Sequence, residues 1–185
     1  VLEDAAEMGL KVVRTWGNLD AGVKTDKVSD KGYTVFTDSV DGSGEKEGVY
    51  YQYFDADLGR PVVNEGEDGL QKLDYALYKA EQEGIKLLIT FTNNWEAFGG
   101  MGQYVQWAKL AGENVSGHDD FYTNETIKGW YKDYIKTLLN HENVYTGVKY
   151  KDDPTIFSWE LANEPRCESD AGCENNTVVK WATEM

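Results

Sequence analysis

Apolar residues gather into three short runs along the chain, and amphipathic stretches lie between them. Residues 10–16, 85–91 and 155–161 are mostly apolar over seven positions, which is typical of buried strands. Residues 69–83 and 127–139 place apolar side chains at i, i+3, i+4 and i+7, which predicts helices with one buried face. The alternation of helices with buried strands predicts a parallel sheet covered by helices.

Two segments of the chain are similar to each other, which supports the same order of elements. Residues 5–13 resemble residues 80–88, because both read as the end of a helix, a glycine and then an apolar strand with a lysine at its second position. We therefore expect Gly9 and Gly84 to end their helices. Shorter helices are expected at residues 103–110 and 177–185.

The segment from residue 17 to residue 68 is rich in Gly and Asp and lacks a long apolar run. Residues 33–37 and 49–54 read as strands, and we expect them to pair as a hairpin around residues 41–44. A stretch this long between elements is usually functional or separately folded.

Two architectures commonly combine parallel strands with covering helices, the open doubly wound sheet and the closed (β/α)8 barrel. No G-x-G-x-x-G follows any of the three strands, which weighs against a dinucleotide-binding fold. A full barrel takes about 250 residues. We therefore expect an α/β protein of the (β/α)8 TIM-barrel class. Residues 1–185 would supply about strands 2–4 with their flanking helices, as the N-terminal half of a single catalytic domain truncated at both ends.

In such a barrel, catalytic groups lie at the carboxyl ends of the strands. The three strand ends here are residues 14–16, 92–95 and 163–165, and each places polar groups beside a large aromatic or a proline. Fixed polar groups next to an indole suit a pyranose ring, which has one apolar face and many hydroxyls. Trp16 and Trp95 are therefore expected against a sugar, with a place in the core as the alternative for each.

Side chains alternate along a strand, so Glu160 and Glu164 are expected to share the inner face of the sheet with Arg14. Two carboxylates buried there need a cation or a proton, and Arg14 is the available cation. The alternatives are that Arg14 is only an ion-pair partner and that Glu164 only caps a turn, while Glu160 is read as structural. His118 and His141 are expected on the surface without partners.

The residues at the end of the third strand and several other motifs together resemble one family of enzymes. NEP alone recurs in many family 5 cellulases and glucanases, but the chain combines it with a DDP-x-IF-x-WEL lead-in, an NNW-x-x-x-GG loop and a DDFYT segment. With them it resembles the endo-β-1,4-mannanases of glycoside hydrolase family 5, of the fungal and plant type. The matching stretches span nearly the whole chain and include VVRTWG at 12–17, GLQKLDYAL at 69–77, FTNNWEAFGG at 91–100, QYVQWA at 103–108, DDFYTN at 119–124 and YKDDPTIFSWELANEPRC at 150–167.

The resemblance implies a retaining (β/α)8 hydrolase with two catalytic glutamates, acting on β-mannan without a cofactor or metal. By resemblance, Glu164 is the acid/base and Arg14 supports the nucleophile electrostatically. Asn163 binds the sugar beside the scissile bond. The other residues implied to bind substrate are Trp16, Asn93, Asn94, Trp95 and, on the leaving-group side, Arg166.

The nucleophile of the family lies on a strand far downstream of NEP, and only 21 residues follow Glu164 here. Glu168, Glu174 and Glu184 are not expected to replace it. We therefore expect the full-length protein to hydrolyse mannan and residues 1–185 alone to be inactive. The alternatives are a family 5 β-glucanase or cellulase, a non-catalytic sugar-binding relic, and an unrelated α/β domain with coincident motifs.

Composition excludes several classes of partner. The chain carries 18 Lys and Arg against 33 Asp and Glu, a net charge of −15, which disfavours nucleic acid and anionic membranes. It is 41% hydrophobic and 13% aromatic, which argues against disorder. No apolar run reaches the roughly 18–20 residues of a membrane span. An uncharged polysaccharide fits this charge, and a monomer is expected for the full-length protein.

Cysteines and sequons indicate the compartment. Cys167 and Cys173 are close enough in sequence for a local disulfide, with two unrelated thiols as the alternative. Asn114, Asn124 and Asn175 each begin an Asn-x-Ser/Thr triplet. Together these features predict a secreted, extracellular glycoprotein.

Overall fold

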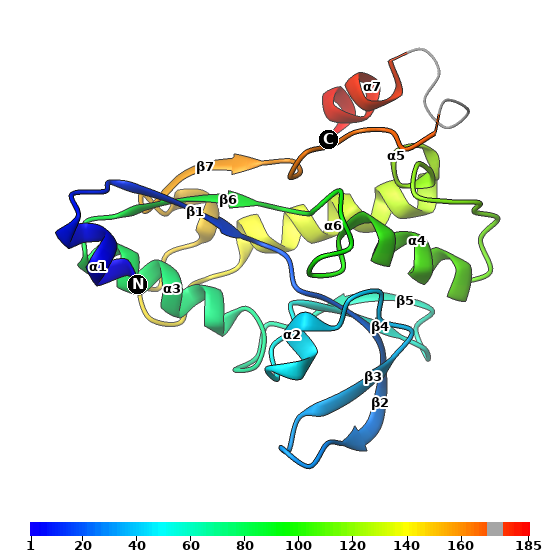
Figure 1. The fold of residues 1–185 in the computed structure, drawn as a ribbon, viewed down its shortest axis with the longest axis horizontal. Helices are drawn as coiled ribbons and strands as arrows, with labels where there is room; N and C mark the ends of the chain where they lie inside the picture. Colours follow the sequence, from blue (N-terminus) through cyan, green and yellow to red (C-terminus); the bar gives the residue numbers. More distant parts are fainter. Residues whose placement is uncertain (170–175) are drawn as a thin grey trace.

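Three parallel strands form the centre of the molecule (Figure 1), a computed structural model that describes residues 1–169 and 176–185. They are β1 (Val12–Trp16), β6 (Lys86–Thr90) and β7 (Ile156–Glu160), in the order β1-β6-β7. The register places Arg14 opposite Leu88, and Leu88 opposite Ser158. All three predicted strands are confirmed, and their carboxyl ends lie at one edge of the sheet.

Two helices cover one face of this sheet. Figure 1 shows α3 (Gln71–Gln82) and α6 (Glu125–Asn140) on the same side of the strands. Leu87 and Ile89 of β6 point toward them and are fully buried. The helical faces predicted from the apolar spacing supply the rest of this core. Its helical members are Leu73, Leu77 and Ala80 of α3 and Ile127, Tyr131, Tyr134 and Leu138 of α6.

Helix α6 is fastened to the ends of two strands. Its N-cap is Asn124, whose side-chain oxygen accepts a hydrogen bond from the backbone N–H of Ile127 at 3.0 Å. The Tyr134 hydroxyl donates to the carbonyl of Gly17, just after β1, and the Tyr131 hydroxyl donates to the carbonyl of Leu161, just after β7. Helix α6 therefore fixes the positions of the carboxyl ends of β1 and β7 relative to each other.

The predicted helix ends are confirmed. Helix α1 (Leu2–Glu7) is followed by Gly9 with a φ of 81°, and α3 is followed by Gly84 with a φ of 65°. None of the described helices is long and apolar enough to cross a membrane. The remaining helices are α2 (Ser43–Lys46), α4 (Gly100–Leu110), α5 (Asp120–Thr123), the 3-10 helix η1 (Tyr150–Asp152) and α7 (Thr177–Glu184).

The segment between β1 and α3 forms a second sheet, which lies near the carboxyl ends of the parallel strands (Figure 1). The buried indole of Trp107 on α4 donates to the carbonyl of Ala21 in this sheet at 3.0 Å, which joins the two parts. The strand order is β3-β2-β4-β5. These strands are β2 (Asp20–Val28), β3 (Thr34–Thr37), β4 (Gln52–Asp55) and β5 (Arg60–Val63).

The predicted hairpin of residues 33–37 with 49–54 is wrong, although both strands exist. β3 pairs antiparallel with β2, and β4 pairs parallel with β2 and antiparallel with β5. The physical reason is that residues 43–46 form helix α2 instead of a tight turn. The unpredicted strand β2 therefore lies between the two expected partners.

The edge strand β7 is only partly covered. Because side chains alternate along a strand, the sequence predicts that Phe157, Trp159 and Leu161 face the covering helices. Trp159 stacks on Phe91 with ring centroids 4.6 Å apart, and Leu161 packs against the core. Phe157 is exposed, which corrects the expectation for that position. Cys173, Glu174 and Asn175 lie outside the described residues, so the disulfide with Cys167 and the third sequon stay predictions.

His141 is buried, so its expected surface position is wrong. Its Nδ1 lies 2.8 Å from Glu65 Oε2 and its Nε2 lies 3.0 Å from Asp74 Oδ1. The Tyr150 hydroxyl donates to the same Asp74 oxygen at 2.6 Å. Asp74 comes from α3 and His141 from the end of α6, so this cluster joins the two covering helices.

This cluster predicts a pH-dependent contribution to stability. Burial acts to lower the pKa of His141, but the hydrogen bonds to Asp74 and Glu65 and their charges outweigh it and raise that pKa above 6.5. The contribution is therefore complete below pH 6.5 and is lost as the pH rises through the higher folded-state pKa. In urea unfolding of the full-length protein, His141→Gln should cost more free energy at about pH 5.5 than at about pH 8.5. Equal costs at both values would contradict this.

Candidate active site

Residues from all three strand ends converge beyond the last regular sheet pairing. The backbone N–H of Gly17 donates to Thr90 at 2.8 Å. Asn93 and Asn163 form a parallel bridge that continues the ladder between β6 and β7. Side chains that follow different strands are thereby brought within hydrogen-bonding distance of one another, as expected for the carboxyl edge of a parallel sheet.

Arg14 is the central cation of this edge. Its Nε and Nη2 both donate to Glu160 Oε2, at 2.9 and 2.6 Å, and its Nη2 also donates to Asn163 Oδ1 at 3.0 Å. The guanidinium carbon lies 5.6 Å from the centre of the Trp16 ring. The Asn163 amide donates onward to Asn93 Oδ1 at 2.9 Å. Arg14 therefore orients the Asn163 amide, whose oxygen and nitrogen both have partners.

Glu164 is held by a second pair of donors. The indole Nε1 of Trp95 donates to Glu164 Oε2 at 2.9 Å, and Arg166 Nη2 donates to the same oxygen at 3.1 Å. The Arg166 guanidinium also lies 5.3 Å from the centre of the Trp95 ring. The indole, the guanidinium and the carboxylate thus restrain one another.

The predicted alignment of Glu160, Glu164 and Arg14 is wrong in one respect. Asn163, and not Glu164, meets Arg14 beside Glu160, because regular β7 ends at Glu160 and the backbone turns at Glu164 with a φ of 48°. The expected burial of the two carboxylates is also wrong, since their side chains are 34% and 53% exposed. The reading of Glu160 as a structural ion-pair partner agrees with its two hydrogen bonds from Arg14.

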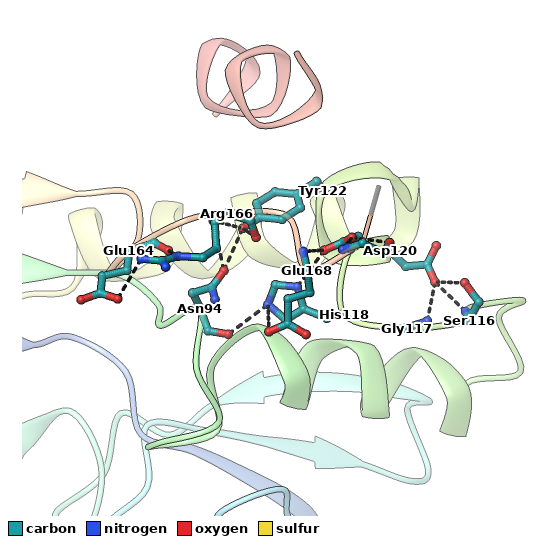
Figure 2. Close-up of polar contacts among 11 residues, drawn as sticks. Asn94, Ser116, Gly117, His118, Asp120, Tyr122, Glu164, Arg166 and Glu168 are labelled. Carbon is teal, nitrogen blue, oxygen red and sulfur yellow. Dashed lines mark hydrogen bonds and ion pairs between the residues drawn. The ribbon is translucent and has the colours of Figure 1, made fainter. Parts of the chain in front are cut away.

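A buried network around Asn94 fixes the segment that follows Glu164 (Figure 2). Asn94 Oδ1 accepts from the backbone N–H of Arg166 at 3.1 Å and from the Tyr122 hydroxyl at 3.2 Å. The Tyr122 hydroxyl in turn accepts from the same Arg166 N–H at 3.0 Å. Asn94 therefore links the loop after β6 to the loop after β7.

His118 belongs to the same network, which corrects its expected place on the surface without partners. Its Nε2 lies 2.9 Å from the carbonyl oxygen of Asn94 and its Nδ1 lies 3.0 Å from Asp119 Oδ1. Asp119 also accepts from the backbone N–H groups of Glu168 and Ser169, each at 2.9 Å. Burial acts to raise the pKa of Asp119, but these bonds together hold it below 3.8.

Sequence reasoning missed the supporting roles of Asp119, Tyr122 and His118. The DDFYT stretch contains the first two, and it entered only as part of the resemblance. The stretch reads as two acidic residues followed by two aromatics, and this pattern does not show what Asp119 and Tyr122 contact. Among the described residues, no group of three or more His, Cys, Asp and Glu side chains is arranged to hold a metal ion.

The exposed aromatic surface lies beside Glu164. Trp95 is 45% exposed, so a core position is excluded for it. Trp95 also lines a cavity of about 610 Å³, together with Glu96, Gln106 and Glu168, whereas Glu164 and Arg14 do not line it. Trp16 is partly exposed and packs against Phe98 with ring centroids 5.3 Å apart. An exposed indole beside a carboxylate suits a sugar ring, which has an apolar face and many hydroxyls.

Known proteins resemble the chain along its whole length. Residues 43–185 match a family model described as GH family 5 beta-mannosidase-like. Mannan endo-1,4-beta-mannosidase 1 of Oryza sativa is 46% identical over 184 residues, which cover 100% of this chain and 35% of that protein. Mannan endo-1,4-beta-mannosidase 3 of Arabidopsis thaliana is 40% identical over 185 residues and is covered to 36%. The chain thus spans about a third of the length of these curated relatives.

Solved structures agree with the sequence matches. The endo-1,4-beta-mannanase from Rhizomucor miehei matches 99% of this chain and 45% of its own, with a TM-score of 0.76 and 38% identity. The endo-1,4-beta-D-mannanase from Thermotoga petrophila matches 100% of this chain and 44% of its own, with a TM-score of 0.69 and 41% identity. The parallel sheet and its covering helices are accordingly part of a (β/α)8 barrel, which confirms the predicted fold class.

Proposed function

Because the chain belongs to glycoside hydrolase family 5, we propose that the full-length protein is a retaining hydrolase that cleaves internal β-1,4-mannosidic bonds in mannan, galactomannan or glucomannan. The observation that carries the proposal is the position of Glu164. It lies after a strand of the parallel sheet, between an exposed indole and a guanidinium, and next to the Arg14–Asn163 pair. The curated relatives named as mannan endo-1,4-beta-mannosidases support the choice of substrate.

Glu164 is the proposed acid/base. A retaining glycosidase needs a carboxylic acid that protonates the leaving oxygen and then, as a carboxylate, takes a proton from water. Trp95 and Arg166 both donate to Glu164 Oε2. Among the described contacts, this leaves Oε1 as the oxygen that can carry the proton to the substrate. The two donors fix the orientation of the carboxyl group during both steps.

The proposed nucleophile lies outside residues 1–185. A retaining pair needs its second carboxyl group about 5–5.5 Å from the first. Glu160, the other carboxylate at this edge, accepts two hydrogen bonds from Arg14 and serves as its ion-pair partner. We propose that residues 1–185 supply strands 2–4 of one barrel domain, and that a later strand of the same domain brings the nucleophile toward Arg14.

The substrate-binding residues divide into two groups. Trp16, Trp95 and Arg166 are at least partly exposed and are proposed to contact the sugar directly. Asn93 and Asn94 are almost fully buried and are bonded to Asn163 and to the segment after Glu164. We therefore propose that these two asparagines hold the site in shape and do not touch the sugar themselves.

The proposal includes the setting in which the enzyme works. Mannan is an extracellular polymer, so a secreted, monomeric enzyme without a cofactor fits the substrate. A Cys167–Cys173 disulfide and glycosylation at the sequons of Asn114, Asn124 and Asn175 fit an oxidising, secretory route. Intact-mass measurement of the protein secreted from a eukaryotic host, before and after deglycosylation and reduction, tests this part.

The activity itself is tested with the full-length protein on linear mannan, galactomannan and cellulose. We expect soluble oligosaccharides from the two mannans, released with retention of the β-anomer as seen by proton NMR. Residues 1–185 alone should release none, because they carry only the acid/base half of the pair. Products from cellulose but not from galactomannan would instead favour a β-glucanase. Glu164-dependent activity of residues 1–185 alone would contradict the placement of the nucleophile.

A further inference from the structure

The loop that carries Trp95 ends in an unusual turn. Three consecutive residues where this loop enters α4 have a positive φ, namely Phe98 at 64°, Gly99 at 88° and Gly100, the first residue of the helix, at 58°. Residues other than glycine rarely adopt this backbone conformation, so the surroundings of Phe98 must impose it. The contacts that impose it decide where Trp95 lies.

Asp20, at the start of β2, holds this turn together with Asp41, whose Oδ2 accepts from the Phe98 N–H at 3.0 Å. Its backbone N–H donates to the Phe98 carbonyl at 2.9 Å, and its Oδ2 accepts from the backbone N–H of Gly100 at 3.1 Å. Gly99 lies so close that an added Cβ would be 2.6 Å from both the Cβ and the carbonyl oxygen of Asp20. The turn therefore sits directly on Asp20.

The other side of the same turn lies against the site residues. A Cβ added to Gly100 would be 2.4 Å from the carbonyl oxygen of Asn93 and 2.6 Å from that of Trp95. The backbone N–H of Met101 also donates to the Asn93 carbonyl at 2.8 Å. Any shift of Gly100 is thus transmitted to the backbone of Trp95, and the Trp95 indole donates to Glu164.

The burial of the Asp20 carboxyl group is expected to cost stability. It is 4% exposed, and it accepts from Gln52 Nε2 at 2.8 Å and Asn18 Nδ2 at 3.3 Å, but no ion pair joins it to a cation in the part of the chain that is described. Burial raises its pKa to about 7, although the bonds from Gln52, Asn18 and Gly100 act in the opposite direction. A buried carboxylate without a cation costs stability, so its contact with the turn needs another explanation.

We propose that Asp20 is a positioning residue of the acid/base site, which fixes the Trp95 indole and through it the Glu164 carboxyl group. The inference rests on the proposed function for its consequence in catalysis. Its structural content, the coupling of Asp20 to Trp95, holds independently of the substrate. Asp20 acts through the Gly99–Gly100 turn and does not itself contact the sugar.

The first experiment reads the position of Trp95 without any substrate. The indole N–H resonance of Trp95 in the full-length protein, assigned with Trp95→Phe, should move in Asp20→Asn. Asparagine keeps the size of the side chain but replaces one acceptor oxygen with an NH2 group, so it cannot accept from both Gln52 and Gly100 as Asp20 does. The matched control is Asp74→Asn, since Asp74 is equally buried but bonds to His141 and Tyr150. A Trp95 resonance that stays in place in Asp20→Asn would overturn the inference.

The second experiment measures catalysis on two kinds of substrate. Asp20→Asn should lower kcat/KM about 10-fold on mannooligosaccharides, whose leaving group needs a proton, and much less on a dinitrophenyl mannobioside, whose leaving group needs none. The double variant with Trp95→Phe should lose no more than Trp95→Phe alone, because Asp20 acts through the indole. Equal losses on both substrates, as expected of Asp74→Asn if it lowers activity through stability, would count against the inference.

A second variant and the activity of the wild type distinguish a failure of this inference from a failure of the proposed function. Gly100→Ala displaces the same turn directly and should show the same substrate dependence as Asp20→Asn. If the wild-type protein is inactive on mannan, the proposed function fails, while the Trp95 resonance still decides whether Asp20 is coupled to the site. If the wild type is active and neither variant changes the substrate ratio, only the inference fails.

Discussion

Glu164→Gln in the full-length protein is expected to lower kcat/KM on mannan about 1,000-fold. The amide keeps the size of the carboxyl group and can still accept from Trp95 and Arg166, so the site should keep its shape. It has no acidic proton, and cleavage of a poor leaving group requires one. The loss is measured from initial rates on a defined mannooligosaccharide, with folding checked by circular dichroism.

A comparison of two substrates with different leaving groups distinguishes the loss of the acid from a general disruption of the site. On a dinitrophenyl mannobioside, Glu164→Gln should keep kcat/KM within about 10-fold of wild type, because that leaving group departs without a proton. Glu160→Gln is the matched control, since it makes the same chemical change on β7 at the partner of Arg14. Its losses should be similar on both substrates. Equal losses for Glu164→Gln would refute the acid/base assignment.

The parallel sheet was predictable because its strands are short apolar runs between amphipathic helices, so burial alone reveals them. β2 was not, because only the start of Asp20–Val28 is buried and most of its later residues face water, which removes the apolar signal. Its pairing with β3 and β4 depends on helix α2, which replaces the tight turn that the Asp-Gly sequence favours. Local sequence could name two strands of this sheet but not their partners.

The strand ends that form the site were predictable for the same reason, since parallel strands bring their carboxyl ends together. The contacts within the site were not. Alternation along β7 predicted Glu160 and Glu164 on one inner face with Arg14, but regular β7 ends at Glu160, so the alternation is lost and Asn163 meets Arg14 instead. His118 contacts the Asn94 carbonyl of the preceding loop, and His141 contacts Glu65 and Asp74, which are distant in the sequence. Only the tertiary fold defines such contacts.

Arg14→Lys is expected to lower kcat about 100-fold in the full-length protein. The guanidinium bonds Glu160 through two nitrogens and Asn163 through one of them, which a single ammonium group cannot reproduce. The charge is kept, so the loss reports the geometry of Asn163 and the support of the nucleophile. Lys86→Met is the control, because Lys86 bonds Pro154 at the opposite end of the sheet, and its rate should stay within about twofold of wild type.

A double variant decides between the two roles open to Arg14. If Arg14 only neutralises Glu160, then Arg14→Met with Glu160→Gln removes the charge and its partner together, and activity should return toward the wild-type rate. If Arg14 also holds Asn163 and faces the nucleophile, the double variant should remain as slow as Arg14→Met alone. The hydrogen bond from Nη2 to Asn163 Oδ1 favours the second outcome, because that bond is absent from both variants.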